Sequence, residues 1–436
     1  MGLTGEHCED SVLTVAQVRP TPAEGTRRTE ILDTAAELFA SSGFRTSLKE
    51  IADACGILPG SLYHHFDSKE AIIVELVERY QAELDVIAAQ ALDDLRREKS
   101  ATDFDRITAL AEAIATCASR HRAAMLQTFY EPPAGAGNEF VRLVNRTPTA
   151  IYNAMFEIVR AGSTRGYIRH GVDPAKFAEQ ICQSMLHTAV GELHRKAGPQ
   201  QMARLKCHML LEGIAVQLPK RTVLDTSNAF AAAEKAIASW NRGSEEDSQL
   251  IHLKMVARTE FGRRSYEATT IRDVASAAHM STGTVYRLIG SKDALLESIM
   301  ATYIKQVNGS WDAVMSAKST PVEKLDALMW IDINVLSHFI DEFKIQLAWL
   351  RASPPPAASH IDQYTNNIRH MRSLLADGER RAEFRIHGGS ANVRAQCLAE
   401  LSWISETIVR RAGVGAALAH ARDTLLRGAA ERSYVP

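Results

Sequence analysis

The sequence lacks the features of several large classes of protein. No window approaches about 18 uninterrupted apolar residues, so no membrane-spanning helix is expected. The amino terminus has no basic segment followed by an apolar run, which argues against a secretory signal peptide. A net charge of −2 gives no sign of the strong basic excess that is typical of many nucleic-acid binders. We therefore expect a cytoplasmic protein whose partners must be inferred from motifs.

Signals of metal binding and catalysis are also missing. The six cysteines, at positions 8, 55, 117, 182, 207 and 397, form no CxxC pair and no metal-ligand spacing. We expect reduced, buried thiols at Cys55, Cys117 and Cys182, with no metal and no cofactor. No glycine-rich phosphate loop is present, and His187 with Glu192 or His194 forms no nucleophile–base pattern. The chain is not expected to be an enzyme.

Residues 47–69 carry the strongest positive signal. Ser47 and Glu50 have the spacing of a capping box, which predicts a helix start. Gly56 suits the end of that short helix, and Pro59 suits the first turn of a second one. Two short helices around a glycine turn are typical of a helix-turn-helix, whose second helix enters the DNA major groove.

This pattern occurs twice. Gly283, Tyr286 and Lys292 each lie 223 positions after Gly60, Tyr63 and Lys69. Near the carboxyl ends of the two halves, residues 425–428 (Leu-Leu-Arg-Gly) resemble residues 210–213 (Leu-Leu-Glu-Gly). A repeat of about half the chain is far longer than a solenoid unit of roughly 20–50 residues. The sequence therefore predicts a duplicated domain.

Apolar residues recur at helical spacing throughout, and no stretch alternates at period two, which predicts an all-α fold. Among the helices, one is predicted over about 200–217 and a short one over about 229–240. The predicted division is 1–25, a disordered lead; 26–80, the first helix-turn-helix domain; 81–217, the first large helical domain; 218–248, a linker; 249–303, the second helix-turn-helix domain; and 304–436, the second large helical domain.

The motif resembles the TetR family of bacterial transcriptional repressors. The residues that carry the resemblance are Ile51-Ala52-x-Ala54-x-Gly56, Gly60-Ser61-Leu62-Tyr63-x-His65-Phe66 and Ser68-Lys69-Glu70. The second half departs from this pattern, because His279 replaces the turn glycine and Leu288-Ile289 replace His-Phe. Histidine can still adopt a positive φ, so the fold of the turn should survive.

The resemblance implies that each half holds a three-helix DNA-binding domain followed by a larger helical domain. It also implies that the last two helices of each half form a four-helix interface. We hypothesise that residues 173–217 and about 390–430 pack together within one chain as a pseudo-dimer. A tether of about 30 residues would hold the halves at roughly millimolar effective concentration, so no second chain is required.

The resemblance also implies which residues contact a double-stranded DNA operator. The hydroxyls of Tyr63 and Tyr286 should reach phosphates, as should Lys69 and Lys292 at the start of a helix. Thr46, Ser47, Thr269 and Thr270 are further phosphate candidates, with helix capping as the alternative role. For the tyrosines and lysines the alternatives are packing and solvation.

Bases should be read by two unlike surfaces. The first comprises Leu58, Pro59, Gly60, Ser61 and His64; the second comprises Ser281, Thr282, Gly283, Thr284 and Arg287. Leu58 and Pro59 suit thymine methyl groups, whereas Arg287 suits guanine or a phosphate. The difference predicts an operator with non-identical half-sites.

The larger domains should hold a pocket for a small, hydrophobic effector, which would act by favouring one separation of the two DNA-binding motifs. The candidate lining residues are Met125, Phe129, Tyr130, Met155, Phe156, Trp311, Met329, Trp330, Phe339, Phe343 and Trp349, and most apolar residues at such spacing are plain core. The predicted function is a ligand-responsive DNA-binding regulator, a repressor in most of the family. The alternative is an interaction or scaffold protein in which only the first motif binds DNA.

Overall fold

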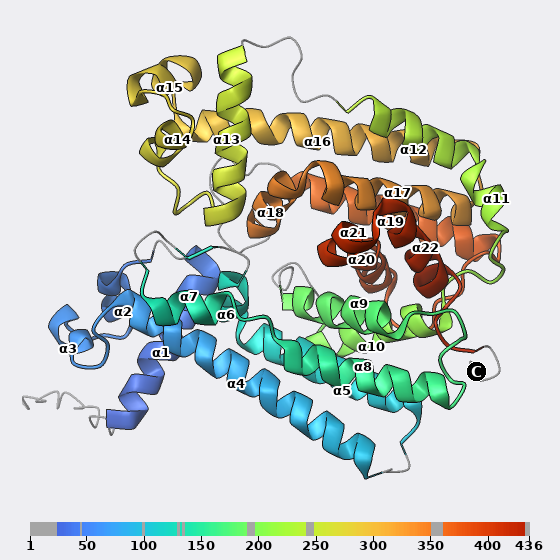
Figure 1. Ribbon diagram of the computed structural model, residues 1–436, viewed down its shortest axis with the longest axis horizontal. Helices are drawn as coiled ribbons and strands as arrows, with labels where there is room; N and C mark the ends of the chain where they lie inside the picture. Colours follow the sequence, from blue (N-terminus) through green and yellow to red (C-terminus); the bar gives the residue numbers. More distant parts are fainter. Residues whose placement is uncertain are drawn as a thin grey trace, which may run out of the picture.

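The computed structural model describes residues 24–43, 46–97, 101–128, 131–132, 136–189, 197–240, 248–349 and 361–431 (Figure 1). Within these ranges the fold is all-α in two halves, as predicted, with no strand and only two isolated bridges. Of the predicted disordered lead, residues 1–23 lie outside the described residues, and the first helix begins at Glu24.

The first half forms the helices α1 (Glu24–Ser42), α2 (Leu48–Ala54), α3 (Pro59–Tyr63), α4 (Lys69–Arg96), α5 (Asp103–Arg120), α6 (Arg122–Gln127), α7 (Asn138–Val144), α8 (Thr149–Thr164), α9 (Pro174–Leu186) and α10 (Pro199–Glu212), with the short helix η1 (His187–Ala189) after α9. The connection contains α11 (Arg221–Asp225) and α12 (Asn228–Ala238).

The second half forms α13 (Ser248–Arg264), α14 (Ile271–Ala277), α15 (Thr282–Ile289), α16 (Lys292–Ser316), α17 (Pro321–His338), α18 (Ile340–Trp349), α19 (Ile361–Arg380), α20 (Ala391–Leu401), α21 (Glu406–Ala412), α22 (Val414–Ala421) and the π-helical turn η3 (Arg422–Leu426).

Helix caps show how the halves correspond. Ser68 caps α4 and Ser291 caps α16, 223 positions later. Thr102 and Thr320 both form capping boxes, at the starts of α5 and α17, 218 positions apart. Helix α6 therefore corresponds to α18, since each directly follows one of these helices.

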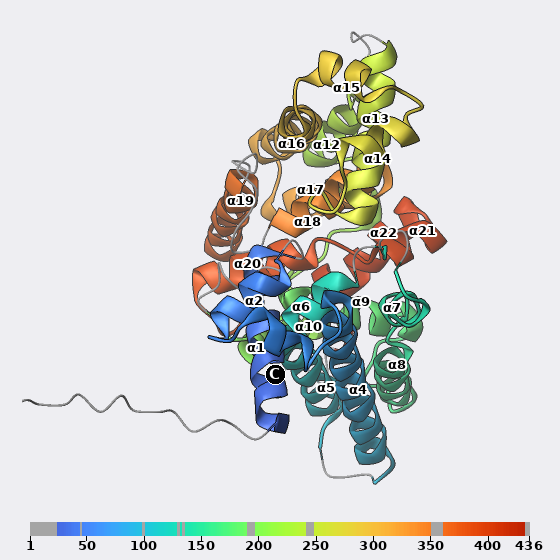
Figure 2. The same ribbon diagram turned by 90° about the vertical axis from the view of Figure 1, so that its left-hand side faces the viewer.

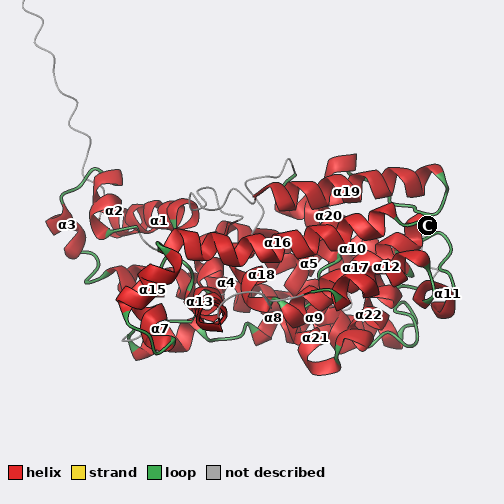
Figure 3. Ribbon diagram, turned by 90° about the horizontal axis from the view of Figure 1, so that it is seen from above, coloured by secondary structure: helices red, strands yellow, loops and turns green. Residues whose placement is uncertain are grey.

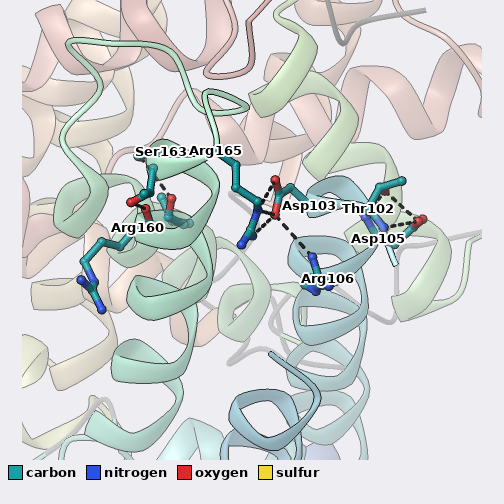
Figure 4. Close-up of polar contacts among 9 residues, drawn as sticks. Thr102, Asp103, Asp105, Arg106, Arg160, Ser163 and Arg165 are labelled. Carbon is teal, nitrogen blue, oxygen red and sulfur yellow. Dashed lines mark hydrogen bonds and ion pairs between the residues drawn. The ribbon is translucent and has the colours of Figure 1, made fainter. Parts of the chain in front are cut away.

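The start of α5 is fixed to the end of α8 by charge (Figure 4). The single N–H of Arg165 Nε is shared between the two Asp103 carboxylate oxygens, at 3.0 and 3.1 Å, and one of these oxygens lies 3.7 Å from Arg106. Beside it, Thr102 Oγ1 accepts from the Asp105 backbone N–H at 3.1 Å. These contacts join the start of α5 to the end of α8.

The connection between the halves is docked rather than loose. Helix α12 packs against α16 and α17, and the Phe230 ring stacks on Trp330 with 5.6 Å between centroids. Trp240 Nε1–H donates to Ser310 Oγ at 2.9 Å. The predicted short helix at 229–240 is confirmed as α12, while most of the acidic stretch after it lies outside the described residues.

The halves meet at the ends of their last helices. Helix α10 was expected to run to about Gln217, but it ends at Glu212 because Gly213 turns the backbone to φ +73°. The chain then pairs with the segment after η3 through four reciprocal N–H···O=C bonds: Ile214 to Leu425 (3.0 Å), Ala215 to Leu426 (3.0 Å), Ala429 to Leu210 (2.9 Å) and Ala430 to Leu211 (2.8 Å). The bonds form two pairs. Within each pair, the donor of one bond lies 215 positions from the donor of the other, and the acceptors are separated by the same number, so the halves are related here by a local two-fold rotation.

Packing around these bonds is two-sided. Helix α10 contacts α20 and η3, and Ser405 Oγ donates to the Glu179 carboxylate at 2.8 Å. Figure 1 shows α20 to α22 lying directly above α9 and α10.

Both helix-turn-helix motifs lie at the same end of the molecule, with α2 and α3 on the first half and α14 and α15 on the second (Figure 1). Figure 2 looks onto that end, and Figure 3 shows the long helices α4 and α16 running from it along the body.

Candidate nucleic-acid interface and interior cavity

The first motif, residues 47–69, has the geometry that its sequence predicts. Ser47 Oγ accepts from the Glu50 N–H at 3.2 Å, and the Glu50 carboxylate accepts from the Ser47 N–H at 2.6 Å, which completes the capping box. Gly56 takes φ +65° in the turn. Leu62 is fully buried and anchors α3, so the opposite face of α3 points outward.

That outward face holds the predicted reading residues. Leu58 is 76% exposed and Tyr63 53% exposed, although both are large apolar or aromatic side chains. Pro59, Gly60, Ser61 and His64 are also exposed. A Cβ added at Gly60 would meet nothing within 4 Å, so the fold itself does not require glycine there.

The second motif, residues 270–292, keeps the same form. His279 takes φ +54°, as predicted for the position of the turn glycine. Val285 is the buried anchor of α15, and Tyr286 is 52% exposed. Ser281, Thr282, Gly283 and Arg287 are exposed and Thr284 is partly exposed, but Ser281 Oγ also caps the helix by accepting from the Thr284 N–H at 3.1 Å.

The threonines at the motif starts divide into caps and core. Thr46 is only 5% exposed and donates its hydroxyl to the Gly43 carbonyl at 2.9 Å. Thr269 is 1% exposed and donates to the Ser265 carbonyl at 2.8 Å. Their hydroxyls, which the sequence predicted to contact phosphates, are therefore turned inward, which favours a structural role for these two side chains. Ser47 and Thr270 are exposed N-caps, as the alternative role required.

The two lysines at the starts of the long helices differ in their surroundings. Lys69 is half-buried, and burial lowers the pKa of its ammonium, opposed by the nearby Glu50 charge. Lys292 Nζ donates to the Tyr266 carbonyl and lies 4.0 Å from the centroid of the Tyr266 ring. The Lys292 ammonium is thus turned toward its own domain, where the sequence predicted a phosphate contact.

A cavity of about 400 Å³ lies between the two large domains. From the first half it is lined by α4, α6, the segment 144–148, α8, α9 and α10, and from the second half by α17, α18 and residues 400–407. Met125 on α6 and Phe343 on α18, which are 218 positions apart, both line it. The cavity therefore lies between the halves, and the equivalent helices α6 and α18 are both part of its wall.

The floor of the cavity is charged. Lys206 is completely buried, and its Nζ lies 2.6 Å from a Glu400 carboxylate oxygen while donating to the Ser184 carbonyl and to Thr188 Oγ1, both at 2.9 Å. Burial, assisted by the Lys206 ammonium, lowers the pKa of His187 to about 4. His187 is therefore neutral at pH 7.

The wall of the cavity has polar atoms without partners. Gln180 is 4% exposed, and neither its Nε2 nor its Oε1 has a hydrogen-bond partner among the described residues. One helical turn further on, Ser184 Oγ also lacks one within the same part of the chain. A buried amide without a partner costs roughly 1–3 kcal/mol, so a polar group that reaches Gln180 would offset that cost.

Comparisons with known proteins agree with the motif geometry. The family model described as "Bacterial regulatory proteins, tetR family" matches residues 31–76 and again 255–299. The HTH-type transcriptional repressor KstR2 of Rhodococcus jostii is 36% identical over 168 residues, which is 35% of this chain and 76% of that protein. The chain belongs to the TetR family.

Two further similarities come from Mycobacterium tuberculosis. Its KstR2 repressor is 31% identical to this TetR-family chain over 148 residues, covering 34% of this chain and 72% of that protein. The solved structure of that organism's ketosteroid transcriptional regulator KstR2 has a TM-score of 0.35 and 18% identity, covering 41% of this chain and 97% of the other.

The predicted pocket residues of this TetR-family protein fall into three groups. Met125 and Phe343 line the cavity. Met155, Trp311, Met329 and Phe339 are buried core, and Phe156 and Trp330 are half-buried; none of these six lines this cavity, and their role in a pocket stays a prediction. Phe129, Tyr130 and the side chain of Trp349 lie outside the described residues.

Sequence reasoning missed the polar lining. Gln180 stands next to Ile181 and three positions after Phe177, and Lys206 stands next to Leu205, so both interrupt apolar helix faces. Such an interruption is the signal that could have drawn attention to them. Their mutual placement with Glu400 depends on the contact between halves, which the local pattern does not encode.

The cavity is lined by α6 and α18, which contact the first helix of each DNA-binding domain. Helix α6 packs against α1, and α18 packs against α13. Thr259 on α13 donates to Asp341 on α18 at 2.9 Å. Arg263, at the end of α13, pairs with Glu131 of the other half at 2.6 Å, and its carbonyl accepts from the Glu131 N–H at 2.9 Å. A change in the cavity is therefore one contact away from α1 and α13, which in turn pack against α2 and α14 of the motifs.

One cluster has the composition of a metal site. Glu83, Cys117 and His121 bring their ligand atoms within 4.8 Å of one another. However, the Glu83 carboxylate is paired with Arg120 at 2.6 Å and with His121 at 2.9 Å, and burial raises the pKa of the Cys117 thiol. The cluster is arranged as an ion pair around a protonated thiol.

The predicted thiol burial is confirmed for Cys117 and Cys182, both fully buried and free, whereas Cys55 is only partly buried. No helix in the described ranges is long and apolar enough to cross a membrane.

Proposed function

We propose that this protein is a cytoplasmic transcriptional repressor whose two fused halves act as a pseudo-dimer on one operator. The observation that carries the proposal is the reciprocal backbone bonding of residues 210–215 with 425–430, together with two motifs at the same end of the body. The KstR2 relatives are named as repressors, which supports the sign of regulation.

The operator is non-palindromic in this proposal. The exposed face of the first motif offers Leu58, Pro59 and His64, and that of the second offers Thr282 and Arg287. Apolar groups favour thymine methyls and arginine favours guanine, so the two arms of the site should differ in sequence. One chain then covers both arms, and a small effector bound in the body releases it.

Selection of bound DNA from a random pool, with the full chain, tests the proposal. We expect one enriched site with two unlike arms, occupied by one chain. Arg287→Ala should relax selectivity in one arm by about tenfold or more, and His64→Ala in the other. A perfect inverted repeat, with both arms equally sensitive to Arg287→Ala, would refute it.

The same experiment tests the scaffold alternative. If only the first motif binds DNA, selection returns a single arm and Arg287→Ala changes nothing. The preserved turn at His279 and the exposed Tyr286 favour the two-armed result.

A further inference from the structure

We propose that the cavity between the halves is the effector site, and that it takes one amphipathic molecule per chain whose polar head hydrogen-bonds to Gln180. The inference rests on the proposed function, since it names where and how the effector is bound. Three observations carry it: the position of the cavity, the orphaned polar atoms in its wall, and the helices it touches.

Position sets the stoichiometry. Met125 and Phe343 occupy equivalent places on α6 and α18, and both line the same space. A repeat-related copy of a site lined by both α6 and α18 would use the same two helices, so this site occurs once, whereas a site enclosed within one half would occur twice. One ligand therefore serves both halves.

The orphaned atoms set the chemistry of the ligand head. Gln180 presents one carbonyl acceptor and one amino donor, and Ser184 adds a hydroxyl. A group that both donates and accepts, such as a primary amide, pairs with both the Nε2 and the Oε1 of Gln180, whereas an ester can only accept. Nearby Lys206 is already paired with Glu400, so no net charge on the ligand is needed.

The remaining wall sets the chemistry of the ligand body. One part of that wall is apolar: the Phe343 and Trp403 rings stack there with 4.4 Å between centroids, beside Leu186, Leu336, Ile340 and Leu347. Polar side chains such as Gln81, Arg146 and Lys344 line the rest, so the ligand body packs against the apolar part. A volume of about 400 Å³ falls in the range of roughly 300–1,000 Å³ that small-molecule pockets occupy. The body is thus apolar.

The neighbouring helices give one ligand access to both motifs. Contact with α6 bears on α1, and contact with α18 bears on α13 through Thr259 and Asp341. A molecule wedged between α6 and α18 fixes the separation of the two motifs together, so release from DNA should follow a single binding event without cooperativity.

Calorimetric titration of the full chain with decanamide tests the inference, with methyl decanoate as the matched acceptor-only probe. We expect one decanamide per chain. Gln180→Leu should weaken decanamide binding by about tenfold and methyl decanoate binding by less. Met125→Trp and Phe343→Trp, which fill the space from opposite halves, should each abolish the whole signal. Met255→Trp, at an exposed position on α13, is the control.

Any of four results would overturn the inference: no decanamide binding, two molecules bound per chain, half of the signal remaining in Phe343→Trp, or equal decanamide affinity of wild type and Gln180→Leu. Thermal melts identify filled variants that fail to fold, and Gln180→Leu, which preserves side-chain size, then decides alone. Operator binding without probe is measured in parallel. If wild type without probe does not bind the operator, the proposed function is contradicted, while the titration still reports on the ligand site.

Discussion

Gly213 and Gly428 hold the two halves together by having no side chains. A Cβ on Gly213 would lie 2.3 Å from the Arg427 carbonyl carbon, and a Cβ on Gly428 would lie 2.4 Å from the Glu212 carbonyl carbon. Both residues take a positive φ, +73° and +92°. The backbones of the halves cross at this point, and the four reciprocal hydrogen bonds flank it.

Substitution at this crossing should loosen the contact between the two halves. Gly428→Ala adds steric conflict to conformational strain, whereas Gly171→Ala, at φ +94° with nothing within 4 Å, adds strain alone. We expect Gly428→Ala to lose about 1–3 kcal/mol more of unfolding free energy than Gly171→Ala. Chemical denaturation measures the difference, and equal losses in the two variants would show that the crossing is not tightly packed.

Gly60 provides a test in which stability and binding move in opposite directions. Since its position is helical and open, Gly60→Ala should stabilise the fold by up to about 1 kcal/mol while its methyl group obstructs DNA. Gly415, the second residue of α22, is equally open and serves as the control. Both variants should melt higher than wild type, but only Gly60→Ala should bind the selected operator more weakly. Unchanged binding would remove Gly60 from the interface.

The exposed tyrosines should act on binding alone. The Tyr63 and Tyr286 hydroxyls have no hydrogen-bond partner within the described part of the chain, and the rings are about half exposed. Tyr63→Phe and Tyr286→Phe should therefore leave the melting temperature unchanged. Each should weaken operator binding several-fold, corresponding to about 1 kcal/mol for one phosphate contact. A fall in melting temperature would indicate a packing role instead.

How much of this structure was accessible from sequence depends on how local the signal is. Capping boxes at Ser47 and Thr270, the turns at Gly56 and His279, and the exposed face of α3 follow from residues within one or two helical turns. The docking of α12 was missed because it depends on Trp330 and Ser310, which lie about 70 to 100 positions away in the chain. The end of α10 was misplaced because Gly213 acts through Arg427, on the other half.

The cavity illustrates the same limit. Aromatic and methionine residues such as Trp311 and Met155 fit a pocket by composition, yet they pack as core. The residues that distinguish the site are polar ones on apolar faces, Gln180 and Lys206, and their partners come from the other half of the chain. Periodicity identifies a buried face but does not tell whether atoms or a ligand fill the space against it.

Comparing Lys292 with Lys69 distinguishes a structural lysine from a lysine that binds DNA. Its ammonium is engaged by the Tyr266 carbonyl and ring, so Lys292→Gln should cost about 1 kcal/mol of stability and leave the salt dependence of operator binding unchanged. Lys69→Gln, the equivalent change in the first motif, should reduce the slope of log affinity against log salt by about one. Filter binding at several salt concentrations measures both slopes. If both variants reduce the salt slope equally, Lys292 contacts a phosphate as the sequence predicted.

Asp332 should make stability depend on pH near neutrality. Its carboxyl is fully buried and accepts from Ser402 Oγ at 2.6 Å and from Trp311 Nε1 at 3.2 Å, and burial raises its pKa to about 7. The folded state therefore holds a proton that the unfolded state releases near its ordinary pKa of about 4. The stabilisation is complete below about pH 4 and is lost as the pH rises to about 7.

Asp332→Asn removes this titration, so the melting temperature of the variant minus that of wild type should increase between about pH 4 and 7 and stay constant above it. Buried His187 and His420, whose pKa values burial lowers to about 4, are present in both proteins and cancel in the difference. Asp53→Asn, at an exposed position, controls for the loss of one carboxylate. If the difference in melting temperature does not vary with pH, Asp332 remains ionised in the folded protein, and the hydrogen bonds from Ser402 and Trp311 suffice to stabilise its charge.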